Sequence, residues 1–163
     1  MNSNVYQQTE LEEMLHLERV SHPPELILAF DGGCQPNPGS KYGSYVMSMY
    51  GKEVLRRQRF GFGHGTCNEA EFNALQLGLD ETMRYLEDRH IEPSELRLRV
   101  LTDSTIIRNR LVGKGRLKVF KENLPASRRM IEHAERCRAV LLKFEGFEVV
   151  WQPRNQNVER FGH

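Results

Sequence analysis

Residues 26–43 read LILAFDGGCQPNPGSKYG, and this stretch decides the fold. Its first five residues are continuously apolar, which is typical of a central strand buried on both faces of a sheet. Asp31 follows this run, and two glycines, a cysteine and an Asn-Pro-Gly turn come after it. The stretch therefore predicts a buried strand that ends on a carboxylate, with a tight polar turn beside it.

The rest of the chain predicts a single mixed sheet with helices. Strand candidates at 42–50 and 53–60, joined at Gly51-Lys52, predict a hairpin. Apolar residues at helical spacing predict a long helix that begins at Asn68. The later elements are a strand at 96–101, a short helix at 104–112, a long helix at 126–144 and a strand at 147–151. The order βββαβααβ indicates an α/β fold.

Length and composition place limits on the class of protein. The 163 residues suit one domain, with residues 1–24 as a polar N-terminal extension and 25–163 as the folded domain. There are 23 Lys and Arg against 22 Asp and Glu, and the net charge is +1. Because no global basic field exists, any nucleic-acid binding must come from a local patch.

Cellular location is predicted from what the sequence lacks. The apolar run at 26–30 is far shorter than a membrane span, and the N-terminus has no secretory pattern. Cys34, Cys67 and Cys137 have no CxxC spacing and read as thiols in a reducing compartment. We expect a cytoplasmic monomer with no membrane partner.

Acidic residues at the ends of predicted elements are the candidates for chemistry. Asp31 and Asp103 each end an apolar strand, and Glu71 lies in the first turn of the long helix. If the two strands are parallel neighbours, the aspartates meet in one crevice at the sheet edge. Carboxylates brought together in this way favour Mg²⁺ or Mn²⁺.

Each acidic residue also has an ordinary structural interpretation. Asp103 or Ser104 could cap the following helix. Glu71 lies three residues after Asn68 and could complete a capping box. Asp31 could belong to a plain turn.

Four segments, in order, resemble type 1 ribonuclease H. They are DGGCQPNPGSKYGSYV, TCNEAEFNALQLGL, LRVLTDSTII and VVWQPRNQN, and the match runs from about residue 26 to 158. The last segment is similar to the bacterial and archaeal subgroup that lacks the basic handle. The resemblance implies a ribonuclease H-like fold with a five-stranded mixed sheet.

The resemblance also implies an activity. It implies a two-metal endonuclease that cleaves the RNA strand of an RNA/DNA hybrid and leaves 5′-phosphate products. Asp31 would bridge two Mg²⁺ or Mn²⁺ ions, while Glu71 and Asp103 would each ligate one or position the water. Two alternatives are a non-catalytic hybrid-binding module on the same fold and a nuclease of this superfold that acts on branched DNA.

Substrate contacts are implied in the same way, through 2′-hydroxyl groups that distinguish RNA from DNA. The matching positions are Gly33, Cys34, Asn37, Asn68 and Thr105. Cys67 stands where the family often has asparagine, and Thr105 stands where many members have glutamine. Basic residues that could hold DNA phosphates, or form a solvated face, are Lys114, Arg116, Lys118, Lys121, Arg128 and Arg129. Trp151 reads as a core residue.

The C-terminus departs from the family pattern. Phe161 falls where the family has a fourth acidic residue, and we expect no final helix of any length. Three interpretations are open. His163 could be the fourth metal ligand, which would predict a preference for Mn²⁺. Alternatively, Glu159 could reach the site, or the fourth ligand could be missing.

Overall fold

The computed structural model describes residues 24–112 and 124–162. Within them, five strands form one mixed sheet in the order β3-β2-β1-β4-β5. The strands are β1 (Leu26–Gln35), β2 (Gly39–Met49), β3 (Lys52–Gly65), β4 (Arg97–Thr102) and β5 (Gly146–Trp151). The helices are α2 (Cys67–Asp88), α3 (Thr105–Leu111), α4 (Leu124–Leu141) and α5 (Arg154–Phe161), with a 3₁₀ turn, η1, at Pro93–Glu95. The predicted extension lies almost wholly outside the described residues.

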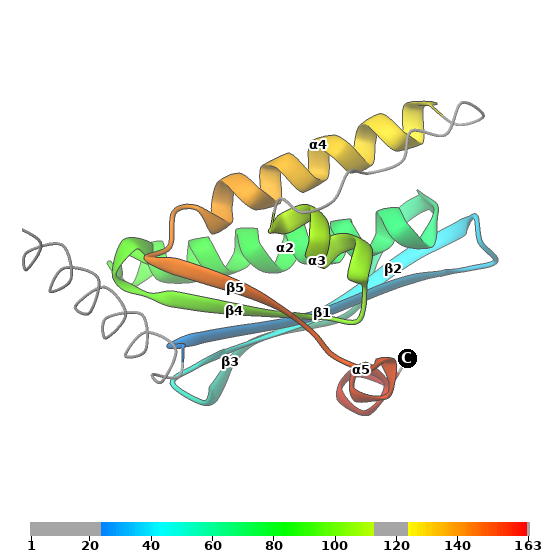
Figure 1. Ribbon diagram of the computed structural model, residues 1–163. Coiled ribbons are helices and arrows are strands. Elements are labelled where there is room, and N and C mark those ends of the chain that lie inside the picture. The colour runs from blue at the N-terminus through cyan, green and yellow to red at the C-terminus, as the bar shows by residue number, and fades with distance from the viewer. Residues whose placement is uncertain (1–23, 113–123, 163) are drawn as a thin grey trace, which may run out of the picture.

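Helices cover the two faces of the sheet unequally. In Figure 1, α2 and α4 lie over one face, and α5 lies on the opposite side. Leu28 and Phe30 of β1 pack into the main core beneath α2, whereas Ala29 packs with Phe161 of α5 in a smaller cluster. β1 is therefore buried on both faces, which is the reason for its continuous apolar run.

The strand directions bring the two predicted aspartates together. β1 pairs with β2 in antiparallel fashion and with β4 in parallel fashion, and Ala29 lies opposite Leu101. Asp31 and Asp103 each follow this pair by two residues. The prediction that the strand ends at Asp31 is wrong, because β1 continues to Gln35 through its pairing with β2. Because β1 and β4 are parallel neighbours, their carboxyl ends lie at the same edge of the sheet. The predicted α/β fold and its mixed five-stranded sheet are confirmed.

The predicted hairpin is present, and β3, which is its second strand, is longer than expected. Tyr50 and Gly51 connect β2 and β3, with φ values of 50° and 78°. Positive φ at both central residues is characteristic of the type I′ turn that joins twisted strands. β3 continues to Gly65 because β2 offers pairing partners back to Gly39.

The long helix begins at Cys67, one residue earlier than the sequence suggested. Thr66 is the N-cap of α2, and its hydroxyl accepts a hydrogen bond from the backbone N–H of Glu69 at 3.2 Å. A capping box between Asn68 and Glu71 is therefore wrong. Glu71 is free of any capping role and lies on the helix face toward β1.

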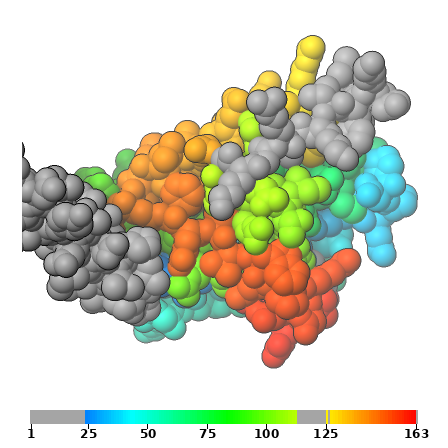
Figure 2. All heavy atoms as spheres, viewed as in Figure 1, coloured from blue at the N-terminus to red at the C-terminus, as the bar shows by residue number. Residues whose placement is uncertain are grey.

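The expectation that no helix follows the last strand is also wrong. α5 covers eight residues and ends at Phe161. Gly162 follows it as a left-handed C-cap, with a φ of 75°. Phe161 is only 1% exposed and anchors the helix against Ala29, Val46 and Leu101. Figure 2 shows α5 in red as part of the surface next to α3. The short helix forms because burial of Phe161 stabilises it, and local propensity contributes little.

Among the described residues, no helix combines the length and apolar character that crossing a membrane requires.

Candidate active site

Close packing of α2 on β1 places Glu71 beside Asp31. A Cβ atom on Gly32 would lie 2.4 Å from the backbone carbonyl carbon and oxygen of Ala70 and 2.5 Å from the backbone nitrogen of Glu71. Only glycine permits this approach of helix to strand. The second residue of the Asp-Gly-Gly sequence therefore sets the distance between two of the three candidate carboxylates.

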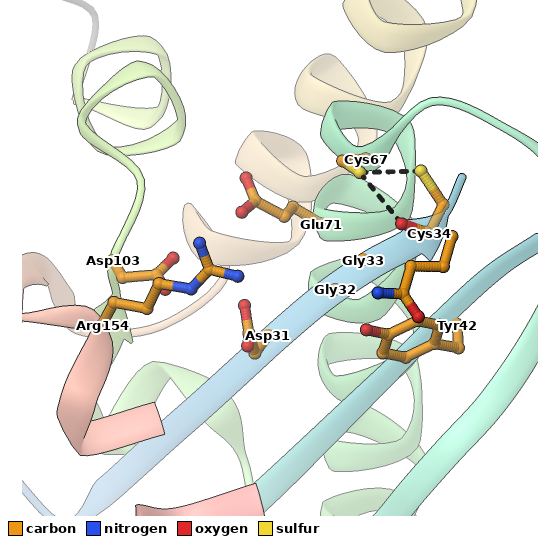
Figure 3. Close-up of a pocket in the computed structure, with 10 residues that line it drawn as sticks. Asp31, Gly32, Gly33, Cys34, Tyr42, Cys67, Glu71, Asp103 and Arg154 are labelled. Atoms are coloured by element: carbon orange, nitrogen blue, oxygen red, sulfur yellow. Dashed lines mark hydrogen bonds between the residues drawn. The ribbon is translucent and has the colours of Figure 1, made fainter. Parts of the chain in front are cut away.

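The three predicted carboxylates converge at the sheet edge. One oxygen from each of Asp31, Glu71 and Asp103 lies within 4.8 Å of the others. Asp31 is buried, and the other two are partly buried. They open into a cleft of about 360 Å³ (Figure 3), whose other lining residues are Gly32, Gly33, Cys34, Gln35, Tyr42, Cys67 and Arg154.

Two interactions hold Asp103 and the helix after it. Ser104 is the N-cap of α3, and its hydroxyl accepts a hydrogen bond from the N–H of Ile107 at 3.2 Å. Ser104 therefore takes the capping role, and the Asp103 side chain lies in the cleft. Trp151 Nε1 donates to the backbone oxygen of Asp103 at 2.9 Å. Trp151 is 44% exposed, so its expected place in the core is wrong.

Burial and mutual repulsion make this cluster difficult to ionise. Burial, and then the Asp103 charge, raise the pKa of Asp31 to about 7. Burial, followed by the charges of Asp103 and Asp31, raises the pKa of Glu71 to about 8. A hydrogen bond from Ser104 and the charge of Arg154 oppose the rise at Glu71. Adding positive charge would stabilise the fully ionised cluster.

Arg154 was missed as a site residue in the sequence. It is the first residue of α5, and its guanidinium group points into the space between Asp31, Asp103 and Glu71 (Figure 3). Its charge lowers the pKa of both Asp31 and Glu71. The sequence did contain a signal, because Arg154 lies in the VVWQPRNQN segment, but local pattern did not show where the side chain points.

The raised pKa values predict how stability depends on pH. In the unfolded chain both carboxyl groups lose their protons near pH 4. In the folded protein they keep them up to about pH 7 and 8, so the folded state binds more protons across this window. Stability in EDTA is therefore expected to fall as pH rises from about 4 to 8, and the Tm is expected to fall with it.

Thermal unfolding of the wild type and Glu71→Gln between pH 5 and 8 checks this prediction. The variant should show a flatter Tm profile, because it lacks the group with the higher pKa. Mg²⁺ should raise the wild-type Tm at pH 8 more than at pH 5, where protons compete for the same oxygens. Parallel profiles for the two proteins would contradict the expected titration.

Residues predicted to contact substrate lie partly at the cleft. Gly33 and Cys34 line it. Asn37 is exposed beside it, where its Oδ1 accepts a hydrogen bond from the backbone N–H of Cys67 at 3.3 Å. Asn68 is exposed in the first turn of α2, and Thr105 is exposed at the start of α3. Asn68 and Thr105 are not among the residues that line the cleft.

The predicted basic patch divides into two parts. Lys114, Arg116, Lys118 and Lys121 lie outside the described residues. Arg128 is exposed on α4. Arg129 forms an ion pair with the buried Glu69 at 3.0 Å, and Lys41 approaches the same carboxylate at 3.4 Å. Arg129 lies at the surface and balances the buried charge of Glu69.

The predictions for a fourth acidic ligand have different outcomes. Glu159 is exposed on α5 and is not among the residues that line the cleft. Phe161 is buried against the sheet, so it cannot take part in polar chemistry. His163 lies outside the described residues, and its role stays a prediction.

Comparison with curated proteins finds relatives at moderate similarity. The bifunctional protein Rv2228c of Mycobacterium tuberculosis is 25% identical over 134 residues, which cover 82% of this chain and 32% of the relative. The uncharacterized protein Mb2253c of Mycobacterium bovis matches with the same figures. This chain thus spans about a third of the length of these relatives. No protein-family model matches.

Solved structures show which fold the domain has. The N-terminal RNase H domain of Rv2228c from M. tuberculosis superposes with a TM-score of 0.67 at 21% identity, covering 83% of this chain and 94% of that one. RNase H1 from the archaeon Halobacterium salinarum gives 0.64 at 22% identity, with 84% and 91% covered. LC11-RNase H1, solved in complex with an RNA/DNA hybrid, gives 0.61 at 23% identity, with 82% and 89% covered.

These likenesses define the fold of the domain. The chain has the ribonuclease H fold, and the resemblance predicted from four sequence segments is confirmed at the level of the fold. Three acidic side chains meet at one edge of its sheet.

Proposed function

We propose that this domain is a metal-dependent endonuclease that hydrolyses the RNA strand of RNA/DNA hybrids. The observation that carries the proposal is the convergence of Asp31, Glu71 and Asp103, whose oxygens lie within 4.8 Å of one another. The ribonuclease H fold supports it, as does the hybrid bound to LC11-RNase H1.

The residues at the site fit a divalent metal. All three ligands are carboxylates, which are the donors that Mg²⁺ and Mn²⁺ prefer. Positive charge would also relieve the burial and repulsion that raise the pKa values of Asp31 and Glu71. Two bound ions would activate the attacking water and stabilise the leaving 3′ oxygen of the RNA.

The chain's own residues have distinct parts in this proposal. Asp31, the buried member of the three carboxylates, would contribute to holding both ions, while Glu71 and Asp103 would each contribute to holding one. Arg154 points into the same space and offers the scissile phosphate a charged hydrogen-bond donor. Cleavage would leave 5′-phosphate products.

In this proposal, residues at the rim of the cleft distinguish the RNA strand from the DNA strand. Gly33 and Cys34 line it, and Asn37 and Asn68 are exposed on the adjoining turn and helix start. These groups would meet the minor groove, where 2′-hydroxyls distinguish the RNA strand. The net charge of +1 implies that binding depends on such local contacts.

Cleavage of a strand-labelled hybrid tests the proposal. Wild type and Asp103→Asn are incubated with the hybrid in Mg²⁺, Mn²⁺ or EDTA, with single-stranded RNA, duplex DNA and a branched DNA junction as competing substrates. Metal-dependent cutting confined to the RNA strand of the hybrid, and lost in Asp103→Asn, is the expected result. Hybrid binding with no cutting in either metal would instead indicate a binding module, and cutting of the junction alone would indicate a DNA nuclease.

A further inference from the structure

Two of the three cysteines are in contact at the rim of the cleft. The Sγ atoms of Cys34 and Cys67 lie 2.7 Å apart, although 33 residues separate them in the chain. Both line the cleft (Figure 3), and neither belongs to the carboxylate cluster. The third cysteine, Cys137, is buried in the main core on α4.

The surrounding contacts hold the two thiols in this position. Cys34 lies near the end of β1, and Cys67 is the first residue of α2. Oδ1 of Asn37 accepts from the Cys34 thiol at 3.5 Å and from the Cys67 backbone N–H at 3.3 Å. A disulfide bond is about 2.05 Å long, so an approach of less than about 1 Å would form one.

We propose that Cys34 and Cys67 are a redox modification site, which peroxide converts to a reversible disulfide that slows cleavage of the hybrid. The disulfide itself follows from the geometry of the two thiols. Its effect on cleavage rests on the proposed function, because Cys34 and Cys67 belong to the segments that would meet the minor groove.

The two cysteines have different parts in the oxidation. Cys67 is the more exposed of the two, so peroxide reaches it first and reacts with its thiolate form. This thiolate attacks one oxygen of hydrogen peroxide, the O–O bond breaks, and the released hydroxide takes up a proton to form water. Cys67 becomes a sulfenic acid.

Cys34 then resolves this intermediate. Burial, and then its hydrogen bond with Cys67, raise the pKa of Cys34 to about 11, so it retains its proton until it reacts. Its sulfur attacks Sγ of Cys67, the S–O bond breaks, and the Cys34 proton leaves with the hydroxyl group as a second water. A dithiol reductant reverses the reaction by thiol–disulfide exchange and is itself oxidised to a disulfide.

The bond would join two segments that contact substrate. It links the end of β1, with its following turn, to the start of α2. It also removes the thiol proton that Cys34 donates to Asn37. The turn and the helix would then be unable to adjust their separation to the minor groove, so hybrid binding should weaken more than the maximal rate.

Thiol counting tests the disulfide independently of any activity. Reduced protein is treated with hydrogen peroxide, quenched with catalase, unfolded and labelled with a maleimide. The three free thiols should fall to one, the intact mass should decrease by two hydrogens, and dithiothreitol should restore all three. Cys137→Ser should still form the disulfide, whereas Cys34→Ser and Cys67→Ser should not. Three thiols remaining in the wild type, or oxidation that proceeds to sulfinic acid, would overturn the proposal.

Cleavage kinetics then test the consequence. Oxidised wild type and oxidised Cys137→Ser should show a severalfold higher KM for the hybrid, restored by dithiothreitol. Whatever activity Cys34→Ser and Cys67→Ser retain should not respond to peroxide. A disulfide that leaves KM unchanged would overturn the regulatory effect. If the reduced wild type cleaves no hybrid, the proposed function fails, and the thiol count alone still decides whether the site exists.

Discussion

Asp31→Asn is expected to reduce hybrid cleavage at least about 1,000-fold, because metal ions contribute several kcal/mol to stabilising the transition state. Asp31 is the buried member of the three carboxylates and would be shared by the ions in the proposed function, so its loss is expected to affect every ion that the cluster would hold. The same change should raise the Tm in EDTA, because the buried carboxylate is costly to ionise. Single-turnover cleavage and thermal unfolding above pH 7 measure the two effects.

A matched control separates the site from general loss of charge. Asp88→Asn removes an exposed aspartate at the end of α2 and should leave both the rate and the Tm close to those of the wild type. Cleavage by Asp31→Asn at more than a tenth of the wild-type rate would show that the carboxylate cluster is not the catalytic centre. Loss of activity together with a lower Tm in EDTA would indicate a structural role for Asp31.

Gly32→Ala is expected to lower stability by about 3 kcal/mol and cleavage by roughly 100-fold. The new Cβ would lie within 2.5 Å of backbone atoms of Ala70 and Glu71, and backbone cannot rotate out of the way. α2 must therefore move away from β1 and carry Glu71 with it, which widens the carboxylate cluster. Urea unfolding and hybrid cleavage at saturating metal measure the two effects.

Gly61→Ala is the control for this substitution, because a Cβ at Gly61 has nothing within 4 Å. It should retain nearly wild-type stability and cleavage. A Gly32→Ala protein that matches the wild type in both measurements would show that the packing of α2 on β1 does not require a glycine at this position. If stability falls while cleavage is unchanged, the helix position does not limit the site.

Local sequence predicted an element well where all residues of the segment have the same degree of burial. The LILAF run indicated a strand buried on both faces, and β1 has this environment. The hairpin was predicted with its turn at Gly51-Lys52, and the structure places the turn one residue earlier, at Tyr50 and Gly51. By contrast, α5 was missed because one buried side chain, Phe161, stabilises it. Trp151 was wrongly predicted to be a core residue, because a tryptophan in a strand does not indicate whether other elements cover its face of the sheet.

The sequence by itself determined the order of elements up to the last strand, the resemblance to ribonuclease H and the acidic residues Asp31, Glu71 and Asp103. It could do so because strand ends, helix starts and apolar runs are local patterns. Only the tertiary structure decided that Arg154 enters the cleft and that the sulfurs of Cys34 and Cys67 touch. Both depend on the packing of α5 and α2 against the sheet, which joins residues far apart in the chain. Local patterns carry no information about such distances.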